Sequence, residues 1–168
     1  MDWPTFIAQW LHVLLGITWF GSAITGNIVF IPALMKLPLD RQREVGGSYG
    51  EQASKVIPIA AMGVILLGII RGTVFGQIKS LDALTTTYGL TWLVALIAAS
   101  ATFAWGKWAI EPAIARMNAI PASEAFQPDG APSLAMTRAV DAVKRVAALE
   151  LLGFFVVFTC MILMRFGY

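Results

Sequence analysis

The chain has 168 residues, of which 58% are hydrophobic and only 13% are charged. Soluble domains are roughly 45–50% apolar and about 25% charged, so these values exclude a soluble globular protein. They also exclude a disordered chain, which needs low hydrophobicity and high net charge. The single cysteine, Cys160, excludes an intramolecular disulfide, and 12 basic against 10 acidic residues do not indicate a nucleic-acid partner. We therefore expect an integral membrane protein.

Four apolar stretches are long enough to cross a bilayer, whose core of about 30 Å requires about 20 apolar residues in a helix. They cover about residues 5–35, 56–76, 88–108 and 146–164, and the last helix as a whole is expected over about 134–166. Ser133 is expected to cap the last helix, whose first turns carry charges outside the membrane. The first stretch lacks preceding basic residues and a cleavage site, so we expect it to stay in the membrane. The sequence thus predicts an all-α, polytopic four-transmembrane-helix bundle, with residues 1–168 as one membrane domain.

Connections and charges predict how the bundle is oriented. Pro38, Gly46, Gly47 and Gly50 mark an expected loop between the first two stretches. Nine of the twelve basic residues lie in or beside the two long connections on one side of the membrane: Lys36, Arg41, Arg43, Lys55, Lys107, Arg116, Arg138, Lys144 and Arg145. The positive-inside rule then predicts a multi-pass protein of the inner (plasma) membrane with both termini outside the cytoplasm. The lipid bilayer is its expected partner, and a homo-oligomer or a larger membrane complex remains open.

Spacing in the first two stretches predicts which faces pack. One seam in the first stretch has a 4-3-4-3-4 spacing that is typical of a helix facing its neighbours, and it contains His12, Gly16, Trp19, Ala23, Gly26 and Phe30. In the second stretch, Gly68, Gly72 and Gly76 are spaced by four. Such a stripe allows close approach of another helix or of a flat ligand.

Ionisable side chains at membrane depth cost about 2.5–3.5 kcal/mol on insertion scales, so each requires an explanation. By the helical rise, His12 lies about 10 Å and Arg71 about 7 Å inside the outer ends of their helices. Glu150 lies about 6 Å from the cytoplasmic end of the last helix. We expect Glu150 to pair with Lys55 or Lys107, which enter from the same side, whereas a proton-relay role is the alternative.

The last helix presents sulfur at the depth of His12, in Cys160, Met161 and Met164. An imidazole together with thioether or thiolate sulfur suits haem iron or Cu(I). Alternatively, methionine and cysteine fill gaps in an apolar core, and His12 is a hydrogen-bonded core residue. The sequence contains no Ser-His-Asp set, HExxH, CxxC or phosphate-binding glycine loop, so whether the protein is an enzyme stays open.

The segment Leu11–Gly21, LHVLLGITWFG, resembles the opening helix of two related membrane families. These are the CopD-like copper-resistance membrane domain and the HemJ-type protoporphyrinogen oxidase. Weaker similarity extends to Ile31-Pro32, Ile57-Pro58 and Thr91-Trp92-Leu93. The resemblance implies a four-helix unit, and the HemJ-type likeness implies haem b at His12. Ala33 stands where the HemJ-type pattern has an arginine.

Three hypotheses follow. In the first, haem b or a related tetrapyrrole is bound by His12, with Met161 as a second axial ligand, Arg71 neutralising a propionate, and Gly68 and Gly72 making room for the macrocycle. In the second, copper is bound by His12, Cys160, Met161 and Met164. In the third, the protein is a non-catalytic membrane subunit or helper without a cofactor.

Overall fold

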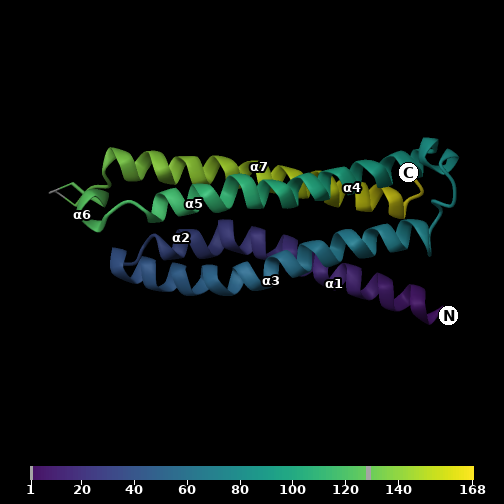
Figure 1. The fold of residues 1–168 in the computed structure, drawn as a ribbon, viewed down its shortest axis with the longest axis horizontal. Coiled ribbons are helices and arrows are strands. Elements are labelled where there is room, and N and C mark those ends of the chain that lie inside the picture. The colour runs from purple at the N-terminus through teal and green to yellow at the C-terminus, as the bar shows by residue number, and fades with distance from the viewer. Residues whose placement is uncertain (1, 128–129) are drawn as a thin grey trace.

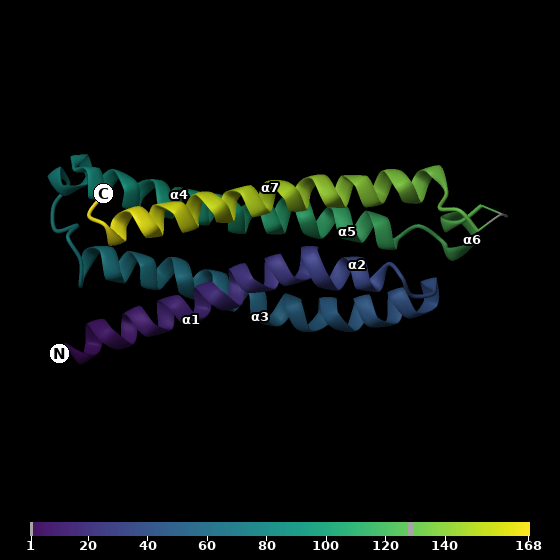
Figure 2. The ribbon, with the colours of Figure 1, turned by 180° about the vertical axis from the view of Figure 1, so that it is seen from behind.

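The chain forms an elongated antiparallel bundle of four long helical segments, which confirms the predicted all-α four-helix fold (Figure 1). The structure is a computed structural model and describes residues 2–127 and 130–168. Each of the four segments is long and apolar enough to cross a membrane, as in a multi-pass membrane protein. Both termini lie at the end of the bundle that also holds the α3–α4 connection, and α6 lies at the other end (Figure 2). We call these the terminal end and the charged end.

The first half of the chain is a helical hairpin. Its first arm is continuous and consists of α1 (Trp3–Thr25), a π-helical turn η1 (Gly26–Phe30) and α2 (Ile31–Leu34). Its second arm is α3 (Leu39–Thr73), which packs along α1.

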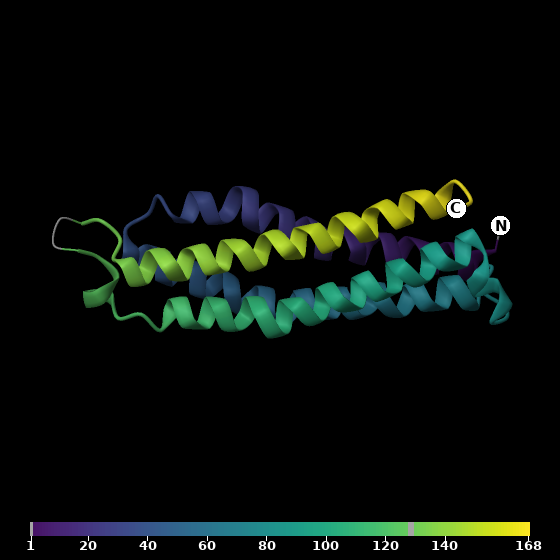
Figure 3. The same ribbon diagram turned by 90° about the horizontal axis from the view of Figure 1, so that it is seen from above.

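The second half repeats this layout after the short 3-10 helix η2 (Asp82–Thr85). Its first arm consists of α4 (Thr87–Trp105), the π-helical turn η3 (Gly106–Ile110) and α5 (Glu111–Asn118). The short α6 (Ala122–Ala125) leads to α7 (Leu134–Arg165), which runs beside α4 and α5 (Figure 3). Ser133 caps α7 as predicted, because its hydroxyl accepts a hydrogen bond from the Met136 N–H at 3.2 Å.

The two π-helical turns have the same cause. In both, a glycine is followed six residues later by a proline, as Gly26 with Pro32 and Gly106 with Pro112. Proline has no N–H to donate, and its ring clashes with the carbonyl group four residues earlier. The residue before each proline instead donates to the glycine five residues back: Ile31 to the Gly26 oxygen and Glu111 to the Gly106 oxygen. The two hairpins therefore share one backbone irregularity with one cause.

The loop predicted around Gly46, Gly47 and Gly50 is wrong, because α3 is helical from Leu39 onward. Pro38 only precedes the helix. Packing against the first arm overrides the low helix propensity of glycine, which costs about 1 kcal/mol per residue. Phe30 stacks on Tyr49 with ring centroids 4.2 Å apart, so the two arms stay in contact beyond the apolar part of the hairpin.

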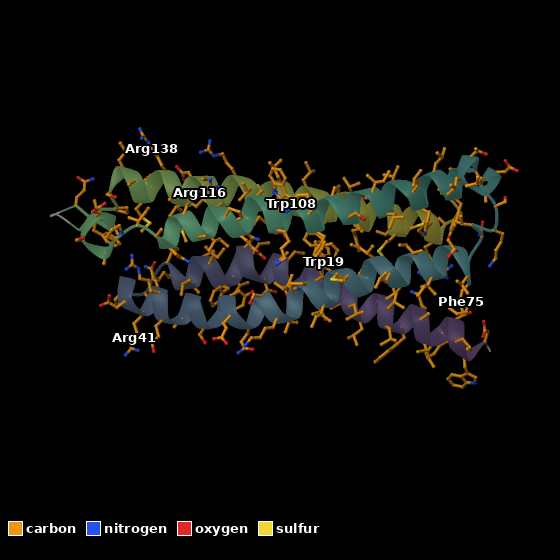
Figure 4. The ribbon with its side chains drawn as sticks, viewed as in Figure 1. Trp19, Arg41, Phe75, Trp108, Arg116 and Arg138 are labelled. Atoms are coloured by element: carbon orange, nitrogen blue, oxygen red, sulfur yellow. The ribbon has the colours of Figure 1, made fainter. Side chains whose placement is uncertain are left out.

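The core lies midway along the bundle, at Trp19, which is 4% exposed (Figure 4). Phe154 meets Trp19 edge to face at 4.8 Å and stacks on Phe20 at 5.2 Å. Ala60 and Ala61 are buried beneath them and let α3 approach closely. The predicted inward seam of the first helix is thereby confirmed at its centre.

Charged side chains gather at the charged end, where Figure 4 shows Arg41, Arg116 and Arg138. The ion pair predicted for Glu150 is wrong. Lys55 pairs with Glu51 at 2.7 Å and Lys107 with Glu111 at 2.6 Å. In both pairs the glutamate lies one turn from the lysine on the same helical segment. Each lysine therefore reaches its own glutamate without extending toward Glu150 on α7. Among the described residues, Glu150 has no ion-pair partner.

Candidate functional site

A cavity of about 710 Å³ lies between the four long helices, in the half of the bundle nearer the terminal end. Its volume falls within the range of about 300–1,000 Å³ that is usual for small-molecule and cofactor sites. The deep wall is apolar and includes Val64, Ile65, Ala95, Leu96, Ala99 and Val157. Polar side chains line the part nearest the helix ends: Arg71, Gln77, Tyr88 and Arg165. The cavity is therefore amphipathic along its length.

The structure brings together most of the residues that the sequence singled out. The cavity lining includes His12 from α1, the predicted glycines and arginine of α3, and two methionines of α7: Gly68, Arg71, Gly72, Met161 and Met164. Cys160 is buried but is not part of the lining. Antiparallel helices of similar length return to the same depth, which is why residues far apart in sequence meet here.

His12 is the buried polar group of the cavity, with only 6% of its surface exposed. Its Nδ1 atom is buried and forms no hydrogen bond of standard geometry with a described residue, although the Val64 backbone lies close to the imidazole. Leaving a buried polar atom unsatisfied costs roughly 1–3 kcal/mol. A ligand that bonded to this imidazole would therefore remove this cost and gain affinity from it.

The glycines of α3 lie close to side chains of the neighbouring helices, as the expected close approach of another helix requires. A Cβ atom at Gly68 would lie 3.3 Å from Cε1 of His12, and one at Gly72 would collide with the Trp92 indole. Trp92 is fixed there because its Nε1 donates a hydrogen bond to the Gly68 oxygen at 3.2 Å. These two glycines make room for an imidazole and an indole, and both also line the cavity. Gly76 lies beyond α3, in the turn that follows it.

Two guanidinium groups line the cavity, although the sequence singled out only Arg71. Arg165 belongs to the last turn of α7. Neither arginine forms an ion pair with any residue that the structure describes. The sequence did contain a signal for Arg165, since it follows Met161 by four residues and thus continues the same helix face.

A metal site made only of the usual nitrogen, thiolate and carboxylate ligands has no basis in the described residues. They contain no cluster of three or more His, Cys, Asp or Glu side chains that could hold a metal ion. A metal bound in this cavity by the protein would depend on the His12 nitrogen and on thioether sulfur. Iron held mainly by its own macrocycle needs fewer protein ligands.

Comparison with known proteins identified no relative. No protein-family model, no curated protein and no solved structure matches this chain.

Proposed function

We propose that this protein is an integral protein of the inner membrane that binds haem b or a related tetrapyrrole in the cavity between its helices. The observation that carries the proposal is the buried imidazole of His12 in the wall of a mostly apolar cavity, whose Nδ1 forms no hydrogen bond of standard geometry with a described residue. The HemJ-type resemblance around His12 points to the same group. Nine basic residues toward the charged end support an orientation with both termini outside the cytoplasm.

The residues around the cavity fit such a group in size and in chemistry. The volume of about 710 Å³ and the apolar deep wall suit a large flat ring. His12 would supply a nitrogen ligand, and Met161 or Met164 a thioether on the facing helix. Arg71 would neutralise a carboxylate of the ring. When bound, haem would supply one-electron chemistry, and the protein would set its access to water and its axial ligands.

An absorption spectrum of the detergent-purified protein, expressed with a haem supply, tests this proposal. We expect a Soret band at one haem per chain. His12→Ala should abolish the band while the helical circular dichroism is retained. Gln9→Ala is the matched control, because Gln9 lines the same cavity one turn away on α1 and has no ligand nitrogen of the imidazole kind. Absence of a Soret band in the wild-type protein would reject haem binding.

The same preparations separate the other two functions. His12, Met161 and Met164 share one cavity, and this set of soft donors favours Cu(I) as the second candidate. If the protein binds one copper ion per chain and His12→Ala loses it, the copper-handling function would replace the haem-binding function. A folded protein that takes up neither haem nor copper would be assigned instead as a membrane subunit or helper without a cofactor.

A further inference from the structure

We propose that Arg71 and Arg165 form a two-point guanidinium clamp at the polar end of the cavity, and that the ligand is an amphipathic molecule with two carboxylates. This inference deepens the proposed function and rests on it for the identity of the apolar body. The new elements are the role of Arg165 and the requirement for two acidic groups on one ligand.

The first argument is that neither guanidinium group has an ion pair or a hydrogen bond with a described residue. Arg71 comes from the last turn of α3 and Arg165 from the last turn of α7, two helices on opposite halves of the chain. Lys79, a third basic residue at the same end, is engaged instead, because it donates to the main-chain oxygens of Thr73 and Val74. Arg71 and Arg165 instead line the cavity without a described ion pair. Two arginines so placed leave two positive charges for a ligand.

The second argument is the distribution of polarity within the cavity. Beyond His12 the wall consists of aliphatic side chains such as Val64, Ala99 and Val157, which offer no polar atom to a ligand. A hydrophilic dianion could not fill that part without burying charge against hydrocarbon. A neutral apolar molecule would leave both guanidinium groups uncompensated. The ligand that satisfies both ends has an apolar body and acidic groups at one edge.

The third argument concerns the chemistry of the clamp. A guanidinium group binds a carboxylate through two parallel N–H···O hydrogen bonds, and these charge-assisted bonds are about twice as strong as neutral ones. Because the two arginines stand on separate helices, each can take its own carboxylate. Two guanidinium groups from two helices therefore match the two carboxylates of a dicarboxylate ligand.

Metal-free protoporphyrin IX and its dimethyl ester test the clamp independently of iron ligation. Both probes have the same ring, but only the first carries two free carboxylates. Binding is measured by fluorescence titration of the whole protein in nanodiscs of phosphatidylcholine, which has no net charge and so avoids the competition of an anionic lipid surface for arginine. The wild-type protein should bind the diacid at least about tenfold more tightly than the diester, since each lost charged hydrogen bond is worth about that factor.

Variants assign this preference to the two side chains. Arg71→Gln and Arg165→Gln should each lower affinity for the diacid by about tenfold and leave affinity for the diester unchanged. Arg71→Lys and Arg165→Lys keep a point charge and should retain part of the preference. Arg116→Gln is the matched control, because Arg116 lies at the opposite end of the bundle (Figure 4). It should bind both probes like the wild type.

The outcomes separate the clamp from the proposed function. Equal affinity of the wild type for diacid and diester would overturn the clamp, as would variants that weaken both probes equally. A Soret band that depends on His12, but a diacid affinity that does not depend on the arginines, would leave haem binding standing without the clamp. Arginine-dependent binding of the diacid without any haem band would reject haem ligation and keep the clamp. No binding of either porphyrin would reject both.

Discussion

The indole Nε1 of Trp92 donates a hydrogen bond at 3.2 Å to the main-chain oxygen of Gly68, the residue against which the His12 imidazole packs. One turn of α3 thus receives an aromatic side chain from α1 and another from α4. This arrangement holds the two hairpins together beside the cavity. The position of His12 therefore depends on Gly68 and Trp92, two uncharged residues.

Replacing Trp92 by phenylalanine should lower the free energy of unfolding by about 1 kcal/mol, the net value of one buried hydrogen bond. The measurement is a thermal melt in detergent followed by circular dichroism. Trp108→Phe is the control, because Trp108 is 82% exposed and its side chain forms no hydrogen bond within the described residues. Equal melting midpoints for the two variants would show that the Trp92 hydrogen bond does not contribute to stability.

Adding a methyl group at Gly72 should destabilise the bundle by about 1–3 kcal/mol, because the new Cβ would collide with the Trp92 indole. Gly47→Ala provides the comparison within the same helix. A Cβ at Gly47 meets no atom within 4 Å, so this variant should gain up to about 1 kcal/mol of helix propensity. Melting midpoints that move in opposite directions are the expected result. A neutral Gly72→Ala would mean that α4 shifts without cost.

Truncating Phe154 to alanine should cost about 3 kcal/mol, because it opens a cavity against Trp19 and Phe20 in the centre of the bundle. The neighbouring Phe155 is 64% exposed on the outer surface of the bundle. Phe155→Ala should therefore change stability by much less. Unfolding titrations with sodium dodecyl sulfate compare the two. Similar losses for both variants would argue that the Trp19 cluster is not the core.

Changing Glu150 to glutamine should increase stability, because it removes an acidic group that has no described ion pair from a membrane-spanning helix. Glu111→Gln should act in the opposite direction, since it breaks the ion pair with Lys107 and costs about 0.3–0.5 kcal/mol. The two midpoints are compared in the same detergent. A clear loss of stability in Glu150→Gln would mean that the carboxylate has a partner or a bound cation in solution.

Periodicity was enough to predict the inward face of the first helix and the depth of the cavity residues. His12 and Trp19 are both buried, as their spacing along the helix indicates. Depth follows from counting residues inward from the helix ends at a constant rise. The helical rise alone predicts that His12, Arg71 and Met161 lie at similar depths, without any knowledge of how the helices pack. The four-helix fold itself follows from four apolar stretches of sufficient length.

Lateral position could not be predicted in the same way. The stripe of glycines on α3 indicated close approach, but not that His12 and Trp92 would be the groups that approach. The helical start of α3 depended on tertiary contacts such as Phe30 with Tyr49, which no local propensity contains. The partners of Lys55 and Lys107 were decided by acidic residues one turn away, which compete better than a carboxylate on another helix.

The shared glycine–proline turns allow the two hairpins to be compared position by position. The offset between Gly26 and Gly106 also separates His12 from Trp92, so these two side chains hold equivalent positions in the two hairpins. The first hairpin carries an imidazole there, and the second carries an indole whose N–H is bonded to the Gly68 oxygen. The first hairpin thus contributes the histidine of the cavity wall, and the second contributes the hydrogen bond that ties α4 to α3 beside it.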